Sequence, residues 1–369
     1  ISIVIAYWNL PKTFFQQDEW WAFGIFIERE QKRGILQVLF ESLFKSGRIH
    51  VNPITELMFY LEYSFFYMDF RGYAIVSMAL HVANALLVYS LALALFGKKV
   101  VSFFIALLFA TSSISHQAVS WVATSINTQG SIMFSLLFSL LFFRYLRGKR
   151  TQRTMLVLAV SCMFLVLLIK ETALPFFLLG AFIYLYSTKR NLAAHKQLFW
   201  AVGIVAALYL LFRAVVYIVA PPVTVGSGEI LKQPGIATFL YRFMTLPIKA
   251  FPESLLPMDS LLALSRTIIR LGYPHFVLSD SSVDPYLVEG AGLDLVNLVI
   301  SAVLGAIAYV SYVLLKSRKD LRKGIVLSLA FIFGSTLLVI FIPGKAGYVS
   351  IIEPRHLYGA TIGASMLTV

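Results

Sequence analysis

The chain has 369 residues, of which 59% are apolar and 13% are charged, and its formal net charge is +13. A soluble domain carries about twice this share of charged residues, and several apolar runs here exceed the roughly 18 residues that indicate a membrane span. The composition therefore excludes an ordinary soluble domain. It also argues against nucleic-acid binding, because roughly half of the 31 Lys and Arg residues lie in four short links between apolar runs.

In chain order, the apolar runs predict an all-α, polytopic integral membrane protein with about ten spans, the first and last incomplete. We expect spans over residues 1–15, 73–96, 101–116, 127–146, 154–170, 173–187, 198–220, 294–315, 324–342 and 357–369. The basic residues of the four links are Lys98, Lys99, Arg144, Arg147, Lys149, Arg150, Arg153, Lys189, Arg190, Lys196, Lys316, Arg318, Lys319, Arg322 and Lys323. Lys and Arg gather in the cytoplasmic loops of membrane proteins, so these links should face the cytoplasm. The other side should hold segments 16–72, 117–126, 171–172, 221–293 and 343–356.

Two of the outer segments are long enough to contain structure of their own. In segment 16–72, apolar and charged residues alternate from Gly24 to Lys45. This pattern predicts an amphipathic helix lying in the membrane interface, and residues 54–66 form a second apolar stretch. Segment 221–293 contains several prolines but also long apolar stretches, so we expect short helices that rest on the membrane.

The chain is expected to form a single transmembrane domain over residues 1–369, cut at both ends from a longer protein. It opens at Ile1 without a Met and closes at Val369, in both cases within an apolar run. Cys162 is the only cysteine, so disulfides within the chain and thiolate metal sites are excluded.

The first candidate for chemistry is the adjacent acid pair Asp18 and Glu19, which precedes Trp20 and Trp21. Two interpretations are open. The pair could cap a helix beside interfacial tryptophans. It could instead supply a general base or a metal ligand at the outer membrane face, where partial burial tunes a carboxylate.

Charged residues inside or at the ends of apolar runs form a second group. Lys170 and Glu171 lie at the outer end of a predicted span, and Arg213 lies within an apolar run. Such groups are costly in a membrane and are usually paired or functional. Lys170 and Glu171 could pair with each other across a tight turn, or Lys170 could contact an anionic head group. Arg213 could belong to a buried structural pair or to a wet cavity.

Basic and imidazole side chains near the outer face complete the candidates. Arg355 and His356 precede the last apolar run, Arg48 and His50 lie in the first outer segment, and His116 lies at an outer span end. Arginine matches phosphate oxygens with two parallel hydrogen bonds, so Arg355 could bind a phosphate. Alternatively, Arg355 and His356 could anchor the chain at the membrane interface. The histidines show no zinc-binding spacing.

The order of these features resembles the GT-C superfamily of membrane glycosyltransferases. Within it, the chain is most similar to the O-mannosyltransferase-like group that carries TPR repeats, with its bacterial relatives. The resemblance spans most of the chain and is carried by Gln17–Trp20, Arg48–Tyr63, Tyr73–Gly97, Phe109–Gly130, Ile169–Thr172 and Arg355–Tyr358. Ser115 and Gln117 stand where the family usually has His and Glu, His356 replaces an aromatic residue, and no TPR region is present.

The resemblance implies a GT-C-like fold that transfers a sugar from a polyprenyl-phosphate donor to a hydroxyl of a protein, glycan or lipid acceptor, with inversion. The reaction would occur on the extracytoplasmic or lumenal side of a bacterial inner membrane or an ER membrane. Asp18 would be the general base, with Glu19 as a second acid. A divalent metal, Mg or Mn, is optional in this superfamily and would be bound by one of these two acids. The residues implied to bind the donor phosphate are Arg355, Lys170, Arg48 and His356.

Two other functions stay open. A lipid or solute transporter would explain Arg213, but the paired breaks in two halves that are typical of transporters are not evident. A non-catalytic subunit of a larger membrane assembly could keep a GT-C-like fold, and the departures at Ser115 and Gln117 permit it. The remaining polar candidates, without an assigned role, are His50, His116, Glu171 and Arg213.

Overall fold

The computed structural model describes residues 2–30, 52–114, 116–147, 152–170, 196–219, 236–272, 285–335, 352 and 354–369, and within these ranges every regular element is helical. The chain divides into two compact units, residues 1–111 with 117–225 (unit 1) and residues 112–116 with 226–369 (unit 2). Three helical stretches of the described chain are long and apolar enough to cross a membrane: Phe70–Phe96, Val122–Tyr145 and Gly290–Leu314. The chain is therefore an all-α protein with the helices of a membrane protein.

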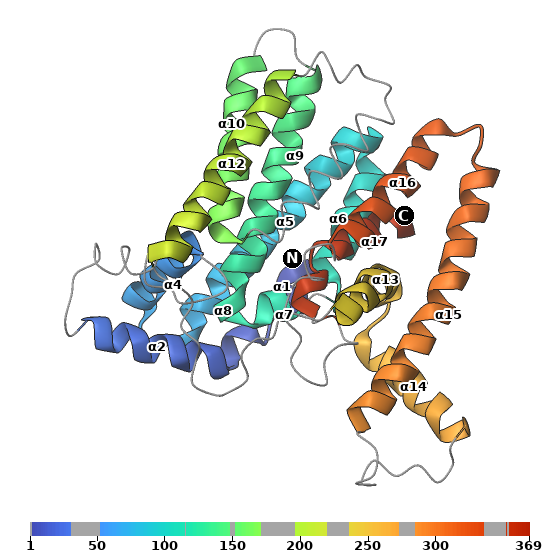
Figure 1. Ribbon diagram of the computed structural model, residues 1–369, viewed down its shortest axis with the longest axis horizontal. Helices are drawn as coiled ribbons and strands as arrows, with labels where there is room; N and C mark the ends of the chain where they lie inside the picture. Colours follow the sequence, from blue (N-terminus) through green and yellow to red (C-terminus); the bar gives the residue numbers. More distant parts are fainter. Residues whose placement is uncertain are drawn as a thin grey trace. The chain divides into compact units, whose positions relative to one another are not determined.

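Unit 1 is built around helix α5. This helix begins at its N-cap Asp69, whose side chain accepts a hydrogen bond from the Arg71 amide, and it ends at Gly97 in the left-handed conformation (φ 69°) that terminates helices. It packs against α6 (Lys99–Thr111) and α9 (Ser131–Arg147), while α10 (Gln152–Ile169) packs against α9 and α12 (Lys196–Val219) (Figure 1). Unit 1 also contains α1 (Ser2–Ala6), η1 (Leu10–Lys12), α2 (Gln17–Glu30) and α4 (Pro53–Phe66).

An irregular stretch leads into α9 and is held by buried polar side chains. It comprises α7 (Gln117–Ser120), α8 (Val122–Ser125) and the π-helical turn η2 (Ile126–Gly130). The Gln129 side-chain amide donates to the hydroxyl of Ser77 (2.8 Å) and to the Ala118 carbonyl (3.0 Å). The backbone carbonyl of Gln129 accepts a hydrogen bond from the Asn84 side chain (3.0 Å). Because a π-turn leaves backbone carbonyls outside the regular helical pattern, these α5 side chains stabilise the irregular segment.

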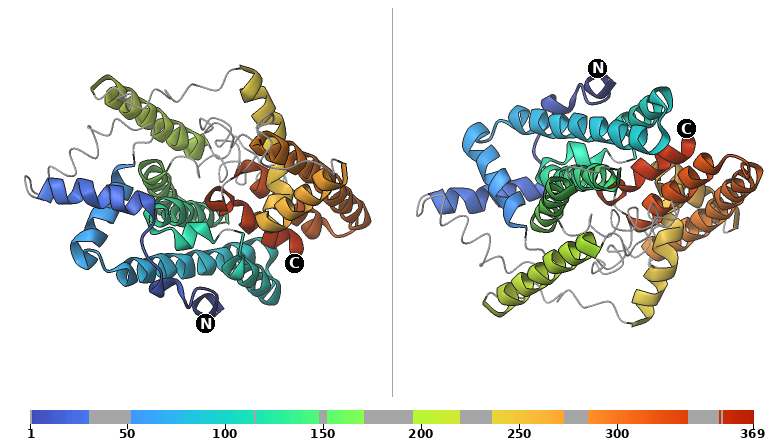
Figure 2. Two further views of the ribbon diagram at one scale, coloured as in Figure 1. Left: turned by 90° about the horizontal axis from the view of Figure 1, so that it is seen from below. Right: turned by 90° about the horizontal axis from the view of Figure 1, so that it is seen from above.

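Unit 2 consists of α13 (Ile236–Glu253), α14 (Met258–Gly272), α15 (Pro285–Leu314), α16 (Lys319–Gly334), η6 (Pro354–Leu357) and α17 (Ala360–Thr368). Helix α15 contacts α13 and α14, and α16 packs along α17, as Figure 2 shows from two further sides. The core joins Leu246 and Phe251 of α13 to Ile332 of α16 and Leu357 of η6. A Cβ at Gly363 would lie 2.5 Å from the Ser328 carbonyl oxygen, so this glycine permits the close approach of α17 to α16.

The structure confirms some of the predicted helices. Helix α4 coincides with the apolar stretch predicted at 54–66, and α13 and α14 are the short helices expected in segment 221–293. Helix α2 begins at Gln17, ahead of the predicted amphipathic helix from Gly24 to Lys45, and is described as far as Glu30. The number of spans stays a prediction, and the range 173–187 lies outside the described residues.

Two predicted spans differ clearly from the helices observed. The range 1–15 contains only the five-residue α1 and the 3₁₀ turn η1, because Pro11 removes a backbone donor where a longer helix would need it. The range 101–116 corresponds to α6, which ends at Thr111 and has 13 residues, short of the ~20 needed to cross the hydrocarbon core. Helix α15, which contains the predicted span 294–315, begins earlier than predicted, at Pro285.

Candidate functional site

The acid pair lies at the beginning of α2, and Glu19 is fully buried there. Its Oε2 accepts a hydrogen bond from the backbone amide of Gln16 (3.1 Å), just before the helix starts. This is the arrangement of a capping box, in which an acid in the first turn satisfies a backbone donor at the helix N-terminus. The capping interpretation of the pair therefore holds for Glu19.

Glu19 caps a second helix with its other oxygen. Oε1 accepts from the backbone amide of Ala123 (3.0 Å), which lies in the first turn of α8. Helix α8 continues through η2 into α9, and the positive end of such a helix favours a carboxylate. The Glu19 side chain thus joins the N-termini of α2 and α8. Asp18 lies one residue earlier in the first turn of α2, and its side chain lies outside the described residues.

Lys170 contacts the same irregular segment from another direction. It follows the last residue of α10, and its Nζ lies 3.3 Å from Thr128 Oγ1 in the π-turn. The carbonyl of Ile169 accepts a buried hydrogen bond from Thr55 of α4 (3.0 Å), which fixes the end of α10. Ala123 and Thr128 are five residues apart on one helical path, about 7 Å along its axis. The structure therefore brings Glu19 and Lys170 together on residues 122–130.

A cluster of buried aromatic rings packs beside the start of α2. Phe15 and Phe23 pack edge to face (centroids 4.7 Å apart), and Phe23 stacks on Phe59 of α4 (5.9 Å). Tyr63 and Tyr73 continue the cluster toward α5, and all five side chains are buried. Buried aromatic pairs of this kind contribute ~0.5–1.5 kcal/mol each beyond the area that they bury. They hold α2 and α4 against α5, and so position the acid pair.

The predicted phosphate-binding residues Arg355 and His356 lie in η6 of unit 2, whereas Glu19 and Lys170 belong to unit 1. Both side chains are half-buried, and the following Leu357 and Tyr358 are fully buried. Burial of Leu357 and Tyr358 fixes the backbone of residues 355–358 in the core of unit 2. Three of the predicted candidates, Arg48, His50 and Glu171, lie outside the described residues.

Other polar side chains, among them two histidines, have local structural contacts. His116 is exposed, and its Nδ1 hydrogen-bonds to the Ser113 carbonyl (2.8 Å). His81, inside α5, is buried and hydrogen-bonds to the Ala110 carbonyl (3.1 Å). Arg213 is half-buried on α12. In both histidines the ring nitrogen must donate, because its partner is a carbonyl oxygen.

The described side chains do not form a donor set that fits the optional divalent metal. Within the described ranges, no three His, Cys, Asp or Glu residues gather closely enough to hold an ion. Both oxygens of Glu19 already accept backbone hydrogen bonds. Because Mg²⁺ and Mn²⁺ need several oxygen ligands, no chemical step is assigned here to a metal.

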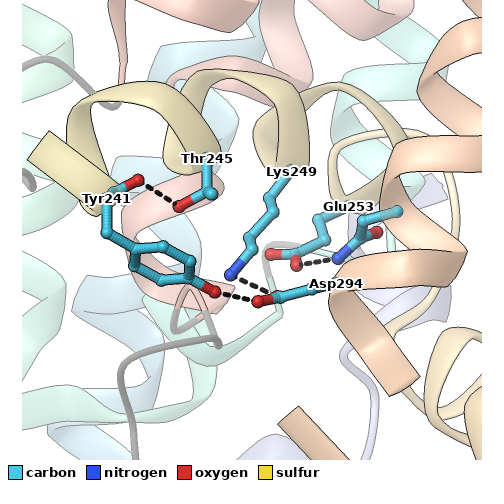
Figure 3. A network of polar contacts seen from close by, with 6 residues as sticks. Tyr241, Thr245, Lys249, Glu253 and Asp294 are labelled. Atoms are coloured by element: carbon cyan, nitrogen blue, oxygen red, sulfur yellow. Dashed lines mark hydrogen bonds and ion pairs between the residues drawn. The ribbon is translucent and has the colours of Figure 1, made fainter. Parts of the chain in front are cut away.

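Sequence reasoning missed a buried charged cluster in unit 2 (Figure 3). Lys249 and Tyr241 of α13 both point toward the carboxylate of Asp294 in α15, forming an ion pair and a hydrogen bond. Asn297 donates to Glu253 Oε1 (2.8 Å), and Lys249, Glu253 and Asn297 are at most 2% exposed. A local signal was present. Lys249 and Glu253 are four residues apart and Asp294 and Asn297 three apart, which places each pair on one helix face.

Burial changes the acid–base chemistry of this cluster. Desolvation raises the pKa of Glu253 from 4.5 to about 8, although Lys249 and the Asn297 hydrogen bond act in the opposite direction. A hydrogen bond with the Ile352 backbone also opposes the rise. A protonated carboxyl is the form that such a site favours.

A second buried acid, Glu62 of α4, was also missed. It is 6% exposed, and neither carboxylate oxygen has a hydrogen-bond partner within the described part of the chain. Desolvation raises its pKa to about 8. The signal was an acid in the otherwise apolar stretch 54–66, where burial of the helix also buries the charge.

Comparisons of the chain with protein-family models, with curated proteins and with solved structures each found no match.

Proposed function

We propose that the chain is a membrane glycosyltransferase that moves a sugar from a polyprenyl-phosphate donor to an acceptor hydroxyl on the extracytoplasmic side. Asp18 acts as the general base, and direct displacement of the phosphate by the acceptor oxygen inverts the configuration at the sugar carbon. The single observation that carries the proposal is the double cap made by Glu19. It fixes the first turn of α2, and with it the backbone of Asp18, at the N-termini of two helices.

The division of labour between the two acids follows from their contacts. Both Glu19 oxygens accept backbone amide hydrogens in a fully buried place, so Glu19 is not available to accept a substrate proton. It acts as a positioning residue for its neighbour. Asp18 is the acid of the pair that the proposal assigns to chemistry, because a general base must reach the acceptor hydroxyl within hydrogen-bond distance.

The proposed step balances without a strong acid. Asp18 accepts the proton of the acceptor hydroxyl as that oxygen attacks the anomeric carbon of the sugar. The bond between this carbon and the phosphate oxygen breaks, and the electron pair leaves with the polyprenyl phosphate. Cations stabilise the charge that grows on the phosphate. Lys170, whose Nζ lies 3.3 Å from Thr128 on the segment that Glu19 caps, supports this role, and the resemblance assigns Arg355, Arg48 and His356 to it as well.

The test is the substitution Asp18→Asn in the chain reconstituted into liposomes with polyprenyl-phosphate mannose and a mixture of hydroxyl acceptors. We expect transfer, measured as release of polyprenyl phosphate, to fall by at least ~100-fold, since general base catalysis contributes about 10²–10⁴-fold. Thermal unfolding should stay unchanged. The matched control is Asp69→Asn, because Asp69 is an exposed acid in the same unit and Asn still caps α5.

Three results would contradict the proposal. Full activity in Asp18→Asn would remove this acid from the mechanism. Substrate-dependent flux through the liposome membrane without any glycosyl product would favour the transporter, and activity that requires a second protein would favour the subunit of a larger assembly. Transfer is measured with several polyprenyl-phosphate sugars, so that a chain that uses a different sugar is distinguished from an inactive chain.

A further inference from the structure

An apolar groove of about 560 Å³ lies within unit 2 between α13, α15 and α16. Its floor on α15 is formed by small residues, Ala302, Gly305 and Ala308, while Phe251 and Phe333 line it from α13 and α16. A Cβ built on Gly305 would meet no atom within 4 Å. The volume is that of a typical small-molecule site, and the lining suits a hydrocarbon chain.

The groove follows the long axis of a helix that is apolar enough to cross a membrane. Its lining on α15 runs from Leu298 to Tyr312, which is about 21 Å of helix. One leaflet of a bilayer contributes about 15 Å of hydrocarbon. The groove is therefore long enough to accept one lipid chain over the full depth of a leaflet.

One end of the groove carries an arginine beside a basic link. The Arg322 guanidinium lies over the Tyr312 ring, 3.9 Å from its centroid, and Tyr312 also lines the groove. Stacking uses the flat face of the guanidinium and leaves its edge for hydrogen bonds. Its buried Nε has no hydrogen-bond partner among the described residues. The link around it holds Lys316, Arg318, Lys319 and Lys323, with Asp320 as its only acid.

We propose that this groove binds an anionic glycerophospholipid of the cytoplasmic leaflet. One acyl chain fills the groove, and the phosphate accepts hydrogen bonds from the edge of the Arg322 guanidinium. Charge complementarity selects this occupant, because a basic link predicted to face the cytoplasm meets a leaflet rich in anionic lipids. The site is separate from the residues proposed for glycosyl transfer, so it does not depend on that function.

The test measures lipid retention by native mass spectrometry on the purified, delipidated chain. Phosphatidylglycerol and phosphatidylcholine with identical acyl chains are added at equal concentration. We expect the chain to prefer phosphatidylglycerol, and Arg322→Gln to lower its affinity for this lipid about tenfold (~1.4 kcal/mol), because the substitution removes a charge-assisted hydrogen bond to the phosphate. Gly305→Leu should lower the binding of both lipids, because its side chain enters the groove.

Each variant has a control with the same chemical change elsewhere. Arg270→Gln removes an exposed charge from α14, outside the basic link, and Gly203→Leu adds the same side chain at an open position on α12. Both controls should bind lipid as the original chain does. Equal binding of the two lipids, or unchanged binding in Arg322→Gln or Gly305→Leu, would overturn the proposal. Displacement of phosphatidylglycerol by an equal concentration of polyprenyl phosphate would assign the groove to an isoprenoid lipid instead.

Discussion

The two units of the protein bury carboxylates in opposite ways. In unit 1, Glu19 is fully buried, and both of its oxygens accept hydrogen bonds from backbone amides at helix N-termini. In unit 2, Asp294 and Glu253 are held mainly by the side chains of Lys249, Tyr241 and Asn297, with one further contact between Glu253 and the Ile352 backbone. The first arrangement is fixed by the backbone, whereas the second depends on the protonation and presence of other side chains.

This difference has a physical consequence for function. A carboxylate between helix N-termini is stabilised by fixed dipoles that need no reorganisation, so Glu19 suits the positioning of a neighbouring reactive group. A carboxyl that shares a buried site with a cation and another acid exchanges its proton more readily near neutral pH. The cluster in unit 2 is therefore one part of the molecule whose stability should respond to pH.

The largest effect is expected from removing the cation of unit 2. Lys249→Met leaves Asp294 facing a buried apolar side chain, and breaking a buried ion pair from one side costs roughly 3–5 kcal/mol. We expect the free energy of unfolding, measured in mixed detergent micelles, to fall by about that amount. The double variant Lys249→Met with Asp294→Asn should recover most of the loss, because no unpaired charge remains. A double variant as unstable as the single one would show that packing, rather than charge pairing, holds this site.

A smaller effect is expected at the double cap of unit 1. Glu19→Ala leaves the amides of Gln16 and Ala123 without their acceptor, and each unsatisfied buried donor costs about 1–3 kcal/mol. The unfolding free energy should fall by roughly 2–5 kcal/mol. Asp69→Ala is the control, since it removes a single exposed cap from α5 and should cost about 1 kcal/mol. Similar losses in the two variants would mean that Glu19 does not join the two helices.

Much of the helical architecture is predictable from local pattern. The apolar run from Tyr73 to Phe96 predicts α5, and the mixed composition of segment 221–293 predicts the short helices α13 and α14. Failures have local causes, such as Pro11 ending the first helical stretch early. The number of membrane spans depends on how helices meet the bilayer, which composition alone does not fix.

The contacts of the candidate residues were less predictable. The acid pair was found, with capping and catalysis left open, and Glu19 proves to cap two helices. Its partner Ala123 is far along the chain and contributes only a backbone amide. Because every residue except proline has this amide, the contact cannot be predicted from the sequence. The cluster of unit 2 joins Glu253 to Asn297 across two helices. Each helix shows only a pair of polar residues, and the sequence does not state which pairs meet.

The third prediction concerns the buried acids Glu253 and Glu62, whose protonation should make the stability of the chain depend on pH. Folding raises the pKa of Glu253 from 4.5 to about 8 through desolvation. Between these values the folded chain holds a proton that the unfolded chain has released, so the free energy of unfolding should fall as pH rises, by up to ~1.4 kcal/mol per pH unit. The fall should level off above about pH 8. The charged groups beside Glu253 are Lys249 and Asp294, and Glu62 of unit 1 should add a slope of the same sign.

Glu253→Gln tests this directly, because the amide keeps the shape of the protonated acid and does not titrate. Unfolding measured from pH 5.5 to 8.5 should give a shallower slope for this variant than for the original chain. The double variant Glu62→Gln with Glu253→Gln should be shallower still. Parallel slopes in all three proteins would mean that both acids stay ionised on folding. The contrast between a backbone-held and a side-chain-held carboxylate would then not extend to proton binding.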